Sequence, residues 1–186
     1  MATANQQKPI LSSRHGYIDA AVWENHGKEN RIFHNVTLKK SWKDGEEWKN
    51  SSASFGHSET LAGAKLLDWA DDIVQAAYAQ KEDFQGGDKP FASKKHRSLE
   101  AAVWQKMEGD KLRYRVCLKR SYKDGEEWKS VSIWLLPSDC LAAARVLTRT
   151  FDAIDQHVAG SNSSFVETAK QQFNAETAPS DEDIPF

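Results

Sequence analysis

The stretch Val36–Lys49, VTLKKSWKDGEEWK, occurs again as VCLKRSYKDGEEWK at Val116–Lys129. Shorter matches on both sides continue the alignment: AAVW at Ala20–Trp23 returns at Ala101–Trp104, an offset of 81 residues against 80 for the longer motif. Two copies of one unit of about 65 residues therefore account for most of the 186-residue chain. Two copies make a tandem pair and not a solenoid, which needs about three or more repeats.

Each copy is predicted to contain strands followed by one helix. Asp-Gly at 44–45 and at 124–125 is a strong signal for a hairpin with a two-residue type I′ turn. Ser58 and Ser138, each followed by an acidic residue, are suitable N-terminal caps for a helix. We therefore expect an α+β protein of two tandem antiparallel β-sheet-plus-helix units that form a pseudo-dimer, with each helix covering the apolar face of its own sheet.

Composition indicates where these units begin and end. The segment 82–96 contains glycine, proline and lysine, which is typical of a linker. From residue 159 onward there are five acidic residues and one basic residue, and the sequence is polar without a sustained period. The expected order is a disordered N-terminus (1–13), a first unit (14–81), a linker (82–96), a second unit (97–160) and a disordered acidic tail (161–186).

Side-chain alternation sorts the residues of each predicted sheet into two faces. One face is apolar, with residues such as Val36, Leu38, Val116 and Leu118. The opposite face combines cations with aromatic rings, and we place the candidate binding residues there or on the hairpins: Trp23, Arg31, Phe33, Lys39, Lys40, Lys43, Trp48 and Lys49 in the first unit, and Trp104, Arg113, Arg115, Lys119, Arg120, Lys123, Trp128, Lys129 and Trp134 in the second.

Cations and exposed indole rings together favour binding of single-stranded DNA. Lysine and arginine neutralise phosphates, and each base stacked on an aromatic ring contributes roughly 1–3 kcal/mol. The type I′ register would also place Lys40 opposite Lys49 and Arg120 opposite Lys129, a like-charge arrangement that a bound phosphate would relieve. A register slip of one residue would instead bury Trp48 and Trp128 in the core.

These hairpins resemble the transcriptional positive cofactor four family. The resemblance covers Tyr17–Gln80 and Leu99–Gly160 and rests on KSWKDGEEWK and RSYKDGEEWK, each followed by a strand and a helix. It implies a curved antiparallel sheet packed by one helix, with strands that line a channel for single-stranded DNA. Members of that family pair two units through their helices, so self-association through helices is a further expectation. This chain departs from the usual pattern because it carries both units itself.

The last six residues, Asp181, Glu182, Asp183, Ile184, Pro185 and Phe186, resemble the acidic tip of bacterial single-stranded DNA-binding proteins. A phenylalanine beside acidic residues suits an apolar pocket with a basic residue at its rim. The resemblance implies partners among genome-maintenance enzymes such as nucleases, helicases and polymerases. The alternative is a solubilising acidic tail.

The remaining features leave three further classes of function to weigh. A transcription or nucleoid regulator would bind the same DNA, and RNA is an alternative ligand because nothing visible reads a 2′-hydroxyl. A metal-dependent nuclease could use Asp44, Glu46 and Glu47 or Asp124, Glu126 and Glu127, although acids commonly belong to hairpin turns. The leading expectation is a non-enzymatic protein with no metal or cofactor. Because the chain has no long apolar run and no secretory signal, we expect no membrane contact and a cytoplasmic location in a bacterium or its phage.

Overall fold

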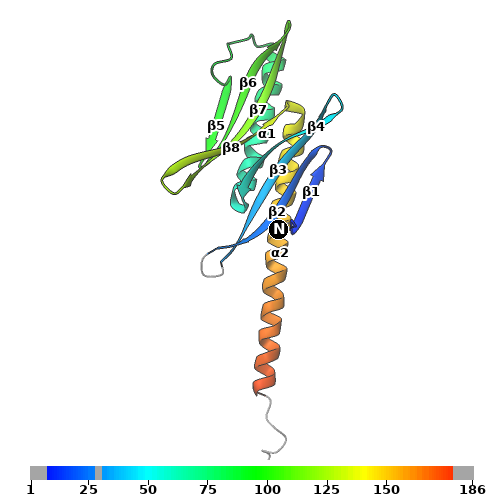
Figure 1. Cartoon of the computed structure of the whole chain (residues 1–186), viewed down its shortest axis with the longest axis vertical. Coiled ribbons are helices and arrows are strands. Elements are labelled where there is room, and N and C mark those ends of the chain that lie inside the picture. Colours follow the sequence, from blue (N-terminus) through cyan, green and yellow to red (C-terminus); the bar gives the residue numbers. More distant parts are fainter. Residues whose placement is uncertain (1–7, 28–30, 178–186) are drawn as a thin grey trace, which may run out of the picture.

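The computed structural model describes residues 8–27 and 31–177, with side chains through residue 160. Within these ranges the chain forms two four-stranded antiparallel sheets, each followed by one helix, which confirms the expected α+β class (Figure 1). The first sheet has the order β1-β2-β3-β4 and the second has the order β5-β6-β7-β8. The elements are β1 (Leu11–His15), β2 (Ile18–His26), β3 (Ile32–Asp44), β4 (Glu47–Gly56), α1 (His57–Gln80), β5 (Ala92–His96), β6 (Leu99–Glu108), β7 (Lys111–Asp124), β8 (Glu127–Leu135) and α2 (Pro137–Thr177).

The two helices lie side by side and are exchanged between the sheets. Helix α1 packs chiefly against β5, β6 and β7, and α2 packs chiefly against β1 and β2. Gly63 of α1 illustrates this contact, because a Cβ there would lie 3.6 Å from Leu118 of the second sheet and 3.3 Å from Leu147 of α2. The expectation that each helix covers its own sheet was therefore wrong. Neither repeat completes its core alone, and the buried residues of both repeats form one cluster.

Two ion pairs join the repeats at equivalent positions. Lys40 of β3 pairs with Asp139 at the start of α2, and Arg120 of β7 pairs with Glu59 at the start of α1. Both carboxylates also accept a backbone N–H that begins their own helix, from Leu136 to Asp139 (2.8 Å) and from Gly56 to Glu59 (2.7 Å). The carboxylate that caps each helix thus also contacts the hairpin of the other repeat, as in a two-fold pseudo-dimer.

The hairpin turns lie one residue later than expected. Asp44 pairs with Glu47 and Lys43 pairs with Trp48, so Gly45 and Glu46 form the two-residue loop. Gly45 has φ +63°, and Glu46 has no positive φ, which is typical of a type II′ turn with glycine at its first central position. The same register holds at Gly125 of the second hairpin. The correction shifts the pairing by two residues, so every side chain remains on its predicted face.

Three predicted boundaries also change. Strand β1 begins at Leu11, inside the expected disordered N-terminus, and β5 lies inside the expected linker. The second unit was expected to end at 160, but Gly160 lies within α2, and Figure 1 shows that helix continuing well beyond the sheets. The predicted tail therefore contains helix as far as Thr177. The predicted docking tip, 181–186, lies outside the described residues.

Candidate nucleic-acid interface

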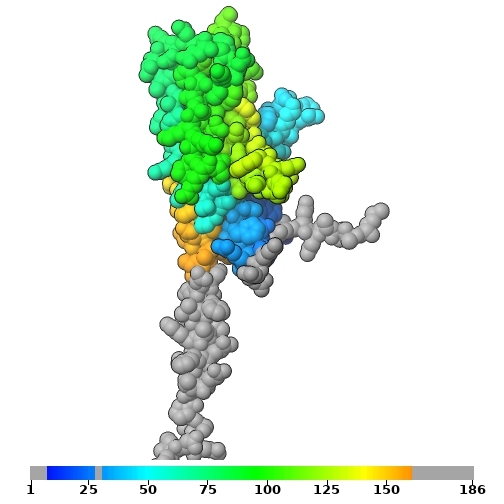
Figure 2. Space-filling view, turned by 90° about the vertical axis from the view of Figure 1, so that its left-hand side faces the viewer, coloured from blue at the N-terminus to red at the C-terminus, as the bar shows by residue number. Residues whose placement is uncertain are grey.

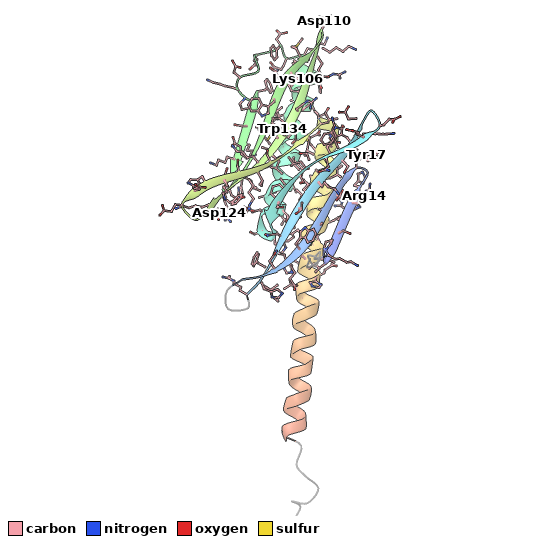
Figure 3. All side chains as sticks on the ribbon, viewed as in Figure 1. Arg14, Tyr17, Lys106, Asp110, Asp124 and Trp134 are labelled. Atoms are coloured by element: carbon pink, nitrogen blue, oxygen red, sulfur yellow. The ribbon has the colours of Figure 1, made fainter. Side chains whose placement is uncertain are left out.

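Each sheet turns one face away from the helices, and we call this the open face. On the second sheet it carries Arg113, Arg115 and Lys119 from β7, with Trp128 and Trp134 from β8. Figure 3 shows Trp134 near the middle of this sheet and Asp124 at the tip of its hairpin. The tryptophans are not beneath the helices, because Trp134 is 44% exposed and Trp128 is 74% exposed.

Beyond the core, β3–β4 and β7–β8 continue as two hairpin arms, 41–51 and 121–131. The outer side of each arm continues the open face of its sheet, and the inner side continues the helix-facing side. On the outer side of the first arm Lys43 lies directly opposite Trp48, and on the second arm Lys123 lies opposite Trp128. Both lysines are exposed and form no ion pair with any described residue. Each arm therefore presents one cation beside one ring that is free to stack.

The duplicated KDGEEWK motif builds the arm in a consistent way. Asp44 forms an ion pair with Lys49 on the inner side of the first arm, and Asp124 and Lys129 form the same pair in the second. The glycine permits the positive φ of the turn. The aspartate and the last lysine of the motif pair on the inner side of the arm, and the first lysine and the tryptophan lie on its outer side. Tyr17 of the β1–β2 turn extends the outer aromatic surface, with its ring 5.7 Å from that of Trp48.

The open face of the first sheet is less aromatic and less basic. Trp23 is half-buried opposite Asn35, and Phe33 is exposed near the start of β3. Lys39 pairs with Asp19 at 3.5 Å. Arg31, just before β3, is exposed. The structure thus brings these predicted residues to one face, although they are more widely spaced than those of the second sheet.

Several cations of the open faces already have acidic neighbours. Lys119 pairs with Glu100 at 3.1 Å, and Arg115 and Arg113 lie 3.4 Å and 4.0 Å from Glu108. Pairs this exposed contribute only about 0–1 kcal/mol, so a phosphate can replace the carboxylate at little cost. The acids hold these cations in position and lower the net positive charge of the open face.

Four predicted binding residues have other contacts. Lys40 and Arg120 lie on the helix-facing side and pair with Asp139 and Glu59. Lys49 and Lys129 lie on the inner sides of the arms. The expected like-charge pairs do not form, because the shifted register places Lys40 opposite Ser51 and Arg120 opposite Val131.

Sequence reasoning missed Trp42. Its position in the alternation assigns it to the apolar face, but it lies beyond the end of the core and is 37% exposed. There it lines a cavity together with Trp104, Trp134 and Arg115 of the second sheet. The signal available in the sequence was the length of the strand, since Trp42 lies four residues past Leu38, the last fully buried apolar residue of β3.

Among residues 8–27 and 31–160, no group of three or more His, Cys, Asp or Glu side chains could hold a metal ion. Cys117 lies on the open face, but burial raises the pKa of its thiol. Burial raises the pKa of Cys140, in the first turn of α2, to about 12. Both cysteines are therefore protonated and unreactive near neutral pH.

No protein-family model matches this sequence, and no curated protein matches it either. Within the described part of the chain, no helix has both the length and the apolar character needed to span a membrane.

Proposed function

We propose that this protein binds single-stranded DNA on the open faces of its two sheets and on the outer sides of its arms, without catalysing a reaction. The observation that carries the proposal is the repeated placement of a lysine, which has no ion pair among the described residues, opposite an exposed tryptophan: Lys43 with Trp48 and Lys123 with Trp128. Rings stack on unpaired bases of any sequence, and the adjacent ammonium neutralises a phosphate.

The proposal extends to selectivity for unpaired strands. Bases in a duplex are already stacked on one another and offer no face to an indole. The structure also contains no helix on the open side of either sheet, where a major-groove reader would be needed, among the described residues. The sequence resemblance to the positive cofactor four family supports the same ligand and the same use of the strands.

Titration of labelled oligo-dT at several salt concentrations tests this function. The logarithm of the association constant should fall linearly with the logarithm of salt concentration, with a slope of about 0.7 per phosphate contacted. A duplex of equal length should bind more weakly at every salt concentration. Equal or tighter binding of the duplex would overturn the proposal.

We further propose that the protein acts in a bacterial or phage-infected cytoplasm, protecting single strands during replication, recombination or repair and recruiting other enzymes through the segment 181–186. The acidic residues of this segment, followed by Ile-Pro-Phe, are suited to a basic, apolar pocket on a partner. Deleting 181–186 should leave oligo-dT affinity intact and abolish recruitment of nucleases or helicases. If the deletion leaves recruitment unchanged, a role as a transcription or nucleoid regulator is the better account.

A further inference from the structure

The base of the first arm lies against the second sheet, and together they line an open cavity. Strands β4 and β8 contact each other, and the space-filling view shows the cyan β3–β4 arm standing out beside the yellow-green β7–β8 segment (Figure 2). The cavity between them has a volume of about 650 Å³, within the usual range of about 300–1,000 Å³ for small-ligand sites. Its walls include Trp42 from the arm, Trp104, Trp134 and Arg115 from the sheet, and Phe84 from the segment that connects the repeats.

The rings of the cavity are arranged to receive a flat ligand. Trp104 and Trp134 lie with centroids 6.2 Å apart and planes inclined by 52°, so they form a corner and not a closed stack. Trp134 is 44% exposed and Trp42 is 37% exposed, so both retain free ring surface. The buried indole nitrogen of Trp104 has no hydrogen-bond partner among the described residues. Arg115 supplies a cation at the edge.

The connecting segment forms the remaining wall and is held by one buried side chain. Gln105, only 4% exposed, accepts the backbone N–H of Gln85 at 2.8 Å and donates to the carbonyl oxygen of Asp83 at 3.1 Å. Phe84 lies between these two anchored residues and lines the cavity.

The pseudo-equivalent position on the first sheet lacks the same side chains. With the 80-residue offset, Trp134 corresponds to Ser54 and Arg115 corresponds to Asn35. The Ser54 hydroxyl is occupied by a 2.9 Å hydrogen bond to Thr37. Tyr122 stands in the place of Trp42. One side of the pseudo-dimer therefore has Trp134 and Arg115 in its cavity, and the other keeps the rings of Trp23 and Tyr122 but has Ser54 and Asn35 at those two positions.

We propose that this cavity is the main base-binding subsite of the protein, and that it receives unstacked bases of single-stranded DNA between Trp42 and Trp134 while Arg115 contacts the adjoining phosphate. The inference rests on the proposed function and adds that the two repeats contribute unequally. The remaining rings, such as Trp48 and Trp128, then act as secondary platforms along the strand.

The matched pair Trp42→Ala and Tyr122→Ala tests this inequality in the full chain. The probe is the thymidine tetranucleotide, which is short enough to occupy one subsite, followed by intrinsic fluorescence and calorimetry. Loss of one base stack should weaken tetranucleotide binding roughly 5- to 160-fold for Trp42→Ala. Tyr122→Ala should change it less than about 2-fold, within the spread of a non-contact substitution.

A second variant tests the subsite without changing the first arm, in case Trp42→Ala disturbs the fold of that arm. Arg115→Gln keeps a polar side chain but removes the charge, and it should reduce the salt slope by about 0.7, the value for one lost phosphate contact. Equal weakening by Trp42→Ala and Tyr122→Ala, or an unchanged slope for Arg115→Gln, would overturn the subsite while leaving single-strand binding intact. Failure of the wild-type protein to bind long oligo-dT would instead overturn the proposed function, and the subsite with it.

Discussion

Removing the ion pair between Lys40 and Asp139 should test whether Lys40 stabilises the fold. The Lys40 side chain is 11% exposed and that of Asp139 is 21% exposed, so solvent screens this pair less than the pairs on the sheet surfaces. Lys40→Met keeps the apolar stem and removes the charge. Asp139 then loses its cation but still accepts the N–H of Leu136.

A hydrogen bond to a charged group contributes about 1.5–3 kcal/mol, and we expect Lys40→Met to lower the free energy of unfolding by that amount. Urea unfolding slopes for small proteins are about 1–3 kcal/mol/M, so the midpoint should fall by roughly 1 M. Lys43→Met is the matched control, since Lys43 is exposed and unpaired with any described residue. Its effect on stability should stay within about 0.5 kcal/mol.

A double-mutant cycle with Asp139→Asn isolates the interaction. Because the two side chains share one contact, the effects of Lys40→Met and Asp139→Asn should be non-additive by about 1–2 kcal/mol in urea unfolding followed by circular dichroism. Additive effects, or a Lys40→Met protein as stable as Lys43→Met, would show that the exchanged helices are not joined to the opposite hairpins in this way.

Gly63→Leu should lower the free energy of unfolding in urea by about 1–3 kcal/mol, because the new side chain would overlap Leu118 and Leu147. The control is Ala79→Leu, at an exposed position of the same helix. Equal stability of the two variants would contradict the packing of α1 on the second sheet. Cys140 remains a thiol in the folded protein up to about pH 12 but ionises near 9 when unfolded, so its contribution is complete below pH 9 and is lost as pH rises toward 12. Between about pH 8 and pH 10 the wild type should therefore lose about 1.4 kcal/mol more than Cys140→Ala, and identical pH profiles would count against a buried thiol. Lys43→Met should reduce the salt slope of oligo-dT binding by about 0.7, whereas an unchanged slope would remove Lys43 from the interface.

The repeat and the alternation of side chains were enough to predict the fold class and both faces. Trp48 and Trp128 are exposed as expected, and the two-residue error in register left the faces unchanged because strand side chains have a period of two. The turn error arose because Asp-Gly and Gly-Glu are both compatible with a two-residue loop. The choice between them depends on where Asp44 finds its partner, Lys49.

The exchange of helices could not be read from the chain. An apolar helix stripe indicates that a helix is covered, but either sheet offers the same surface when the two repeats are alike. Strands β1 and β5 were missed because LSSRH and ASKKH have almost no apolar alternation; they are edge strands held by pairing with β2 and β6. The cavity at Trp42 was beyond sequence reasoning because it forms between two repeats.

The most direct measurement is the position of the strand in a crystal of the protein with a short oligo-dT. We predict bases stacked on the tryptophans of the open faces and arms, with phosphates near Arg115 and Lys123. A strand bound along the helices, or phosphates gathered far from both sheets, would contradict this prediction.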